Sequence, residues 1–176
     1  MNLSFSTKWP PEMGDLAGQP NYFISKIWAG AIENRILSPE DMYKYIKLYK
    51  EKFGEIWDHK DRGDAYGPKL HTIREDENNR WCPGMKIHPV INNRSRFRFQ
   101  FAPVLECTGV QLIRICHRFV PYPPAVYVGG YLLDRMDDEQ VRQLALNDGF
   151  PSVEAFFLWF NKDFEGKIIH WTNLKY

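Results

Sequence analysis

Side chains that could bind or transform an anionic ligand are concentrated in residues 69–74, which read Lys-Leu-His-Thr-Ile-Arg. Arg74 is a fixed cation whose planar fork pairs with carboxylate or phosphate. Lys69 can act as a base if burial or a neighbouring charge lowers its pKa, and Thr72 can act as a nucleophile if a base takes its proton. Composition alone also allows an ordinary half-buried strand, in which positions 70, 72 and 74 face one way and 69, 71 and 73 the other.

The composition is that of a folded and nearly neutral protein. The 176 residues fit one domain, with 44% apolar and 15% aromatic residues and a formal net charge of +1. Because no overall positive field attracts nucleic acid, any such binding must use a local patch. We expect Cys82, Cys107 and Cys116 to be reduced, because they lack paired spacing. No apolar stretch approaches the ~18 residues of a membrane span, so we expect a cytoplasmic protein with no membrane partner.

Two helices are expected in the first third of the chain. Asn21 can begin a helix that Gly30 would end. Ser38 with Pro39 at the next position begins a second helix, whose apolar stripe ends before Gly54. Residues 58–67 are charged and contain glycine, so they are predicted to form a loop.

A β-hairpin is expected around Asn92-Asn93, between strands 85–91 and 94–101. In the second strand Arg94, Arg96 and Arg98 alternate with phenylalanines, which would place three guanidiniums on one face and three rings in the core. The arginine stripe is either a solvated hairpin face or a track for phosphates.

The remaining pattern predicts an α+β fold around a mostly antiparallel barrel, because strands and helices follow in no strict βαβ order. Further strands are expected at 3–5, 110–115, 126–132 and 168–171, and the segment Pro121–Pro124 is expected to be rigid. One helix is expected after Asp137, with Met136 packed on its first turn and Gly149 at its end, and another after Ser152.

The motif of residues 69–74 resembles that of the ASCH family, whose members are PUA-like β-barrel proteins associated with RNA. The resemblance extends to the start of the chain at Phe5, to the helix that ends with residues 26–30, to the turn 80–87 (Arg-Trp-Cys-Pro-Gly-Met-Lys-Ile), and to segments 144–150 and 166–171. It implies one ASCH domain over residues 1–176, with a helical insertion at about 31–66. It also implies that the lysine motif lines a cleft.

One branch of this family, the bacterial N4-acetylcytidine amidohydrolases, uses a lysine, a threonine and a glutamate. By motif these roles fall on Lys69, Thr72 and Asp148, where the aspartate is one methylene shorter than the family's glutamate. Neutral Lys69 would take the proton of Thr72, and Asp148 would serve the leaving amine or the water. Residues three apart on a regular strand face opposite sides, so Lys69 and Thr72 converge only if the chain bends, for which Gly67-Pro68 offers a place.

These observations predict binding of RNA or a modified nucleoside, with amide hydrolysis of N4-acylated cytidine and ribonuclease activity as alternatives. No cofactor or metal is implied, and His71 is expected to be a hydrogen-bonded barrel residue. Trp81 could belong to the core or stack on a base. The expected catalytic residues are Lys69, Thr72 and Asp148, and the expected ligand-binding residues are Lys26, Lys69, Thr72, Arg74, Trp81, Arg94, Arg96 and Arg98.

Overall fold

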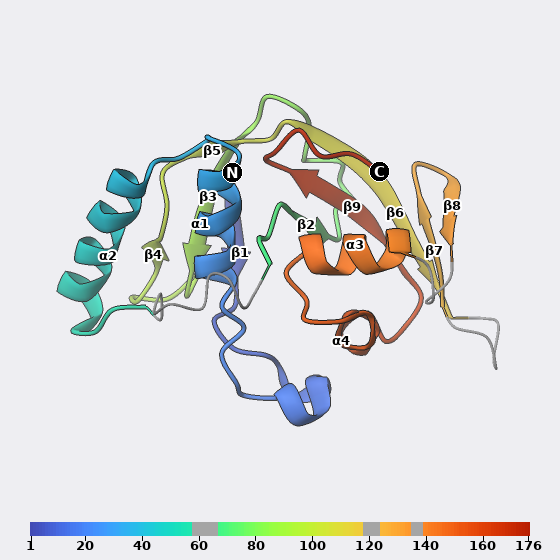
Figure 1. Ribbon diagram of the computed structural model, residues 1–176, viewed down its shortest axis with the longest axis horizontal. Coiled ribbons are helices and arrows are strands. Elements are labelled where there is room, and N and C mark those ends of the chain that lie inside the picture. Colours follow the sequence, from blue (N-terminus) through green and yellow to red (C-terminus); the bar gives the residue numbers. More distant parts are fainter. Residues whose placement is uncertain (58–66, 118–123, 135–138) are drawn as a thin grey trace.

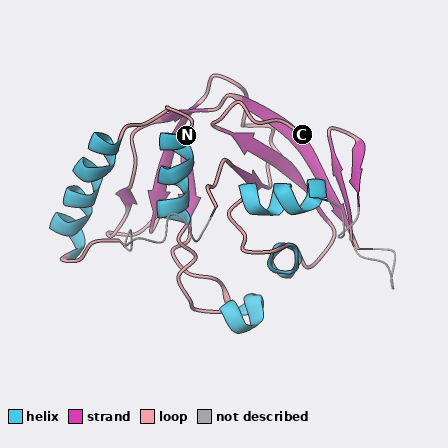
Figure 2. Cartoon of the chain, in the orientation of Figure 1, coloured by secondary structure: helices cyan, strands magenta, loops and turns pink. Residues whose placement is uncertain are grey.

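Strands of the chain form two sheets (Figure 2). The computed structural model describes residues 1–57, 67–117, 124–134 and 139–176. The smaller sheet contains β1 (Asn2–Phe5), β3 (Lys86–Ile91), β4 (Phe99–Gln100) and β5 (Leu105–Glu106). The larger contains, in spatial order, β2 (His71–Arg74), β9 (Phe164–His170), β6 (Gly109–Cys116), β7 (Ala125–Val128) and β8 (Tyr131–Asp134).

The α+β class is confirmed, whereas a closed barrel is not observed among the described residues. β1 pairs with β3 in parallel, and the other pairings are antiparallel. The larger sheet ends at β2 and β8, and neither strand pairs with the smaller sheet in the described part of the chain. The segment 168–171, expected to be a strand of the barrel, belongs as far as His170 to β9, which lies inside the larger sheet between β2 and β6.

Helices accompany both sheets. Helices α1 (Phe23–Glu33) and α2 (Pro39–Phe53) lie with the smaller sheet at the left of Figure 1, and α3 (Glu139–Asn147) and α4 (Val153–Trp159) lie with the larger sheet at the right. A 3-10 helix spans Pro11–Leu16. The predicted caps of α2 are confirmed: Ser38 forms a capping box with Asp41, and Gly54 ends the helix with a φ of 78°. Ser152 likewise caps α4.

Gly30 does not end α1, which continues to Glu33. A Cβ at this position would lie 2.7 Å from the main-chain oxygen of Lys69. The glycine therefore allows the lysine motif to approach the helix closely, a role that spacing along the sequence does not reveal.

The predicted hairpin is present, but its second strand is much shorter than expected. β4 covers only Phe99–Gln100, and residues 92–98 form a loop with positive φ angles at Asn92 and Arg94. Arg94, Arg96 and Arg98 therefore do not form a stripe on a strand. Phe97 is 49% exposed, so the expectation that all three rings join the core is wrong for this residue.

The predicted strand 126–132 is two strands, β7 and β8, joined by a tight turn. Gly129 and Gly130 both have positive φ angles, which is the geometry that a two-residue hairpin turn requires. The adjacent glycines were the signal for this turn in the sequence.

The predicted insertion at 31–66 contributes to the core through α2. The Tyr45 ring packs on Trp28 of α1, and Tyr49 and Phe53 pack edge-on against Phe99 of β4. Most of the loop predicted at 58–67, residues 121–123 of the rigid segment, and the first-turn residues Met136 and Asp137 lie outside the described residues.

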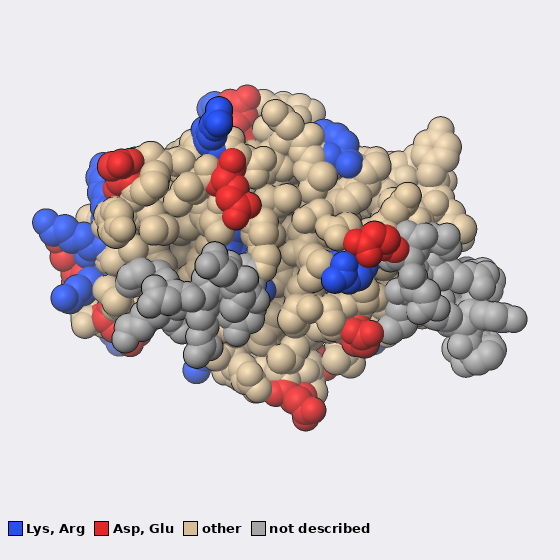
Figure 3. Space-filling view, viewed as in Figure 1, with Lys and Arg blue, Asp and Glu red and all other residues tan. Residues whose placement is uncertain are grey.

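Charged side chains are interspersed on the face drawn in Figure 3, where lysine and arginine alternate with aspartate and glutamate. The near-neutral net charge of +1 is thus not a balance between two large patches on this face. The three cysteines are free, as expected.

Candidate ligand-binding site

A buried ion pair joins the two sequence motifs. Lys69 Nζ lies 2.5 Å from Asp148 Oδ1, and the two side chains are 2% and 5% exposed. The same ammonium donates to the Asp148 carbonyl, while Lys26 Nζ donates to the next carbonyl, that of Gly149, at 2.5 Å. Three of the predicted site residues thus meet at one turn after α3.

Main-chain hydrogen bonds hold this arrangement together. The Lys69 amide donates to the carbonyl of Lys26 in α1 at 3.0 Å, and the Leu70 amide donates to that of Asn147 at the end of α3 at 2.8 Å. The start of the β2 segment is therefore attached to both helices, as their positions in Figure 1 suggest. Gly149 has a φ of 87°, and a Cβ there would lie 3.2 Å from Lys69, so this turn needs glycine for conformation and for space.

Burial lowers the pKa of both lysines. Desolvation lowers the pKa of Lys69 to about 8, the Arg74 charge acts in the same direction, and Asp148 partly offsets both. Desolvation and the charge of Lys69 lower the pKa of Lys26 to about 8. Burial opposes ionisation of Asp148, but Lys69 and His71 hold its pKa below the usual value. Asp148 is therefore ionised at neutral pH, and Lys69 is a cation that can readily lose its proton.

His71 connects Asp148 to the last residue of the chain. Asn147 Nδ2 donates to the Tyr176 hydroxyl oxygen at 2.9 Å, and that hydroxyl lies 2.8 Å from His71 Nε2. Burial lowers the pKa of His71, so its ring is neutral at pH 7. A hydroxyl oxygen can accept two hydrogen bonds, so the Asn147 contact does not by itself fix the tautomer of His71. The Asp148 carboxylate beside Nδ1 favours the tautomer in which the Tyr176 hydroxyl donates to Nε2 and His71 carries its proton on Nδ1. This N–H group faces Asp148 Oδ1 at 3.6 Å, where the contact is electrostatic.

His170 adds a second neutral imidazole to this cluster. Its ring centroid is 5.3 Å from that of His71, and the side chain is fully buried. Burial, together with the proximity of His71 and Lys175, lowers the pKa of His170 to about 3. Neither ring nitrogen has a hydrogen-bond partner among the described residues. Such unpaired buried groups are rare in folded proteins and carry a desolvation cost.

Arg74 and Phe23 both line a pocket of about 400 Å³, which we call the Arg74 pocket. The Arg74 guanidinium donates to the Ser4 carbonyl at 2.8 Å and lies 5.3 Å from the Phe5 ring centroid. Lys69 Nζ lies 4.8 Å from the centroid of the Phe23 ring, so Phe23 connects the pocket to the ion pair. The full lining is Ser4, Phe5, Ser6, Phe23, Arg74, Asn92, Asn93 and Trp159.

Thr72 is buried, at 1% exposure, but is not bonded to Lys69. Lys69 and His71 both face Asp148, and Thr72 is the next residue along β2, where the side chain turns to the opposite face. Within the described residues Lys69 Nζ donates to Asp148 and not to the threonine hydroxyl. The bend that would bring Lys69 and Thr72 together is absent from this structure.

The other predicted ligand residues lie apart from the ion pair. Trp81 is 6% exposed and belongs to the hydrophobic core. Arg98 donates to Asn2 Oδ1 at 3.1 Å, and the Arg96 guanidinium lies 4.7 Å from the Phe97 ring centroid. These arginines and Arg94 follow Asn92 and Asn93, so their loop borders the Arg74 pocket through its first two residues.

Sequence reasoning missed several members of the site. His71 was assigned an ordinary structural role, and Phe23, Asn147, His170 and Tyr176 were not considered as site residues. The position of His71 inside the lysine motif was an available signal, as was the run Asn147-Asp148-Gly149. For His170 and Tyr176, no local pattern distinguishes these residues from other polar side chains.

Comparison of the chain with protein-family models, with curated proteins and with solved structures found no match. Over the described residues, no helix combines the length and apolarity needed to cross a bilayer. In the same part of the chain no three histidine, cysteine or acidic side chains gather closely enough to hold a metal ion.

Proposed function

We propose that the protein binds RNA or a modified nucleoside, with one nucleoside in the Arg74 pocket. The observation that carries this proposal is the combination of a guanidinium, three aromatic side chains and two amide side chains around a volume of about 400 Å³. Pockets for small ligands usually measure roughly 300–1,000 Å³. The ASCH-like motif of residues 69–74 and a PUA-like relationship belong to the same proposal.

Each group around the pocket has a role in this proposal. Phe23 and Trp159 offer rings on which a base can stack, as in recognition of single-stranded RNA. Asn92 and Asn93 carry both donors and acceptors that can read a base edge. Two nitrogens of Arg74 donate to main-chain carbonyls, that of Ser4 at 2.8 Å and that of Ile73 at 3.4 Å, and the remaining N–H groups can bind a phosphate or a base carbonyl.

Binding can be tested by titrating the protein with cytidine, N4-acetylcytidine, cytidine monophosphate and a short single-stranded RNA, with calorimetric detection. Arg74→Gln should weaken binding of the mononucleotide at least ten-fold, because a charge-assisted hydrogen bond contributes roughly 1.5–3 kcal/mol. Arg142→Gln is the matched control, because the Arg142 side chain is 57% exposed and its ion pair within the described residues is with Glu139 on its own helix. Equal effects of the two substitutions would contradict the assignment of the pocket.

Amide hydrolysis of N4-acylated cytidine is a second candidate function. The observation that favours it is the buried Lys69, whose pKa of about 8 leaves roughly a tenth of it neutral at pH 7. Because Thr72 faces away from Lys69, the proposed reaction requires residues 69–72 to bend when the substrate binds. Lys69 then takes the proton of Thr72, whose oxygen attacks the acyl carbon, and passes that proton to the leaving amine. The C–N bond then breaks, the amine leaves with a proton, and water activated by Asp148 releases the acyl group from Thr72.

A panel of N4-acylcytidines, analysed by chromatography, tests the second candidate. Thr72→Ala should abolish turnover, Thr72→Ser should retain it in part, and Asp148→Asn should slow it by about 10²–10⁴-fold. A wild-type protein that binds these nucleosides without hydrolysing them would exclude the reaction and leave recognition. Labelled RNA in the same incubations would reveal the cleavage products expected of a ribonuclease.

A further inference from the structure

One face of the larger sheet carries a continuous set of side chains that begins at Arg74. Residues directly opposite in antiparallel strands have side chains on the same face. Arg74 is opposite Lys167, and Lys167 is opposite Leu112. Two residues further along β6, Arg114 lies between Glu165 of β9 and Tyr127 of β7 and therefore belongs to the same face.

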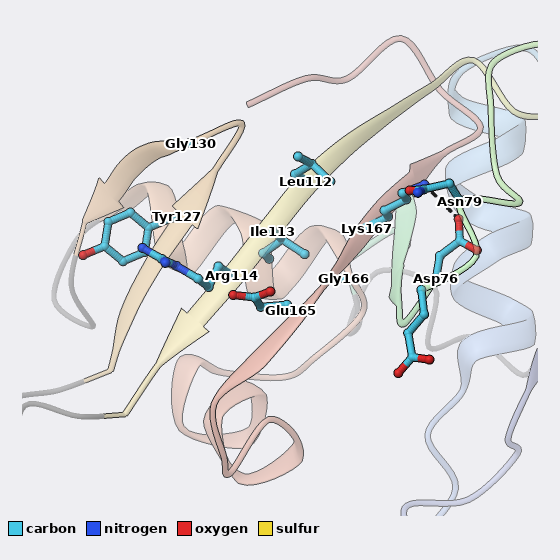
Figure 4. A pocket seen from close by; sticks show the side chains of 11 residues that line it. Asp76, Asn79, Leu112, Ile113, Arg114, Tyr127, Gly130, Glu165, Gly166 and Lys167 are labelled. Carbon is cyan, nitrogen blue, oxygen red and sulfur yellow. Dashed lines mark hydrogen bonds and ion pairs between the residues drawn. The ribbon is translucent and has the colours of Figure 1, made fainter.

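A pocket of about 420 Å³ lies on this face, which we call the sheet-face pocket (Figure 4). At one end Lys167 Nζ pairs with Asp76 Oδ2 at 2.9 Å, and Asp76 also accepts the amides of Arg80 and Trp81. The Asp76 carboxylate is thus already occupied by hydrogen bonds within the protein. The pocket is lined by Asp76, Glu77, Asn79, Leu112, Ile113, Arg114, Tyr127, Gly130, Glu165, Gly166 and Lys167.

At the other end of the pocket lie a guanidinium, an aromatic ring and a carboxylate. The Arg114 guanidinium lies 4.7 Å from the centre of the Tyr127 ring (Figure 4). Glu165 is directly opposite Arg114 and exposed, yet no ion pair joins the two among the described residues. Leu112 is 63% exposed and adds apolar surface beside them.

These groups match the chemistry of a nucleobase with an exocyclic amino group. A base has a planar apolar face that can stack on Tyr127 or on the guanidinium plane of Arg114. A carboxylate such as Glu165 accepts a hydrogen bond from the amino group of cytosine but has no donor for the carbonyl of uracil. The pocket carries Arg114 and Lys167 against Asp76, Glu77 and Glu165, so phosphate attraction contributes little here.

We propose that the sheet-face pocket is a second base subsite for single-stranded RNA, selective for amino-bearing bases such as cytosine over uracil. The inference rests on the proposed function, because Arg74 lies on the same sheet face and also lines the pocket assigned to the first nucleoside. A strand held at Arg74 reaches Arg114 and Tyr127 by crossing β9 and β6. A peptide on this surface is the competing interpretation.

Fluorescently labelled C6 and U6 oligonucleotides, with cytidine monophosphate as a one-nucleotide probe, test the subsite. Tyr127→Leu should weaken C6 binding on the order of ten-fold, because that is the usual effect of losing one stacked base. Tyr127→Phe should bind C6 like the wild type. Neither change should alter binding of cytidine monophosphate, which fills the Arg74 pocket alone. Tyr131→Leu is the matched control, because Tyr131 is 81% exposed in the neighbouring strand and does not line the pocket.

Glu165→Gln should reduce a several-fold preference for C6 over U6 to nearly none, while thermal unfolding stays unchanged. If Tyr127→Leu binds C6 like the wild type, the subsite is refuted and a peptide becomes the better candidate for this surface. If the wild type binds cytidine monophosphate but shows no preference for C6, the subsite is refuted and the Arg74 pocket stands. If it binds none of the probes, the proposed function fails and the subsite fails with it.

Discussion

Replacing Lys69 by methionine should destabilise the protein through the charge that it leaves behind. Methionine keeps an apolar stem of similar length, so packing changes little, but Asp148 loses its nearest cation at 2.5 Å. Removal of one partner from a buried pair typically costs roughly 3–5 kcal/mol. The chain can limit this cost by protonating Asp148, whose ordinary pKa is 3.8. Protonation at pH 7 costs at most about 1.36 × (7 − 3.8), or about 4 kcal/mol. We therefore expect a loss of roughly 3–4 kcal/mol.

The sign of the pH dependence provides a second test of the same substitution. In the variant, Asp148 or the adjacent His71 binds a proton more tightly in the folded state than in the unfolded chain, where the ordinary pKa values are 3.8 and 6.5. A raised pKa in the folded state contributes stability that is lost as pH rises through it. The variant should thus gain up to about 1.4 kcal/mol as pH falls from 7.5 to 6.5. In the wild type, the folded-state pKa of Lys69 is about 8, so the unfolded chain binds slightly more protons over this range and stability rises with pH by only about 0.1 kcal/mol, opposite in sign to the variant.

Urea unfolding followed by tryptophan fluorescence measures both quantities. Lys86→Met is a matched control, because Lys86 also pairs at 2.5 Å, with Glu106, but both side chains are about 60% exposed. It should cost less than about 1 kcal/mol. The double substitution Lys69→Met/Asp148→Asn removes both charges of the pair and should recover most of the loss. A Lys69→Met loss as small as that of Lys86→Met, with no pH slope, would refute the view that this pair is buried and ionised.

Three further substitutions test other features of the fold. In urea unfolding, His170→Phe should have the stability of the wild type at pH 7. As pH falls from 6.5 to 4.5, the variant should lose about 2–3 kcal/mol less free energy of unfolding than the wild type. The reason is that the folded state keeps His170 neutral down to about pH 3, whereas the unfolded chain protonates it near pH 6.5. An unchanged pH profile would contradict its burial. Gly30→Ala should cost roughly 1–3 kcal/mol although alanine has the higher helix propensity, because the alanine Cβ would lie 2.7 Å from the Lys69 carbonyl oxygen. Gly67→Ala is the control and should be neutral, because a Cβ at that position meets no atom within 4 Å. Equal thermal stability of these two variants would argue against that close approach. Ser38→Ala should cost about 0.5–2 kcal/mol in the same assay, and no loss would mean that the capping box is dispensable.

Features that depend on a few neighbouring residues were predictable from the sequence. Ser38 and Gly54 mark the two ends of α2, and Ser152 begins α4, because a side-chain cap or a glycine at positive φ acts on the nearest turn. β6 covers the predicted strand 110–115 with one further residue at each end. The α+β class followed from the order of such segments.

Errors arose where a local pattern had more than one structural solution. The alternating arginines and phenylalanines of residues 94–98 suggested a strand, but positive φ angles at Asn92 and Arg94 give a loop instead. Gly30 was predicted to end a helix, but the glycine is needed there because the main chain of Lys69 approaches the helix closely. The seven-residue segment 126–132 is long enough for one strand, yet Gly129-Gly130 divides it.

The sequence predicted which residue types could act together, and tertiary structure decided how they meet. Lys69 and Asp148 are 79 residues apart, and their contact depends on α1, α3 and β2 being joined at one turn. The lowered pKa of Lys69 follows from burial, and the tautomer of His71 follows from its position between Asp148 and Tyr176, neither of which is encoded locally. The turn of Thr72 away from Lys69 is likewise decided by the register of β2 against β9. Desolvation and long-range pairing arise only when the chain is folded, and for this reason the chemistry of the site could not be read from its motif.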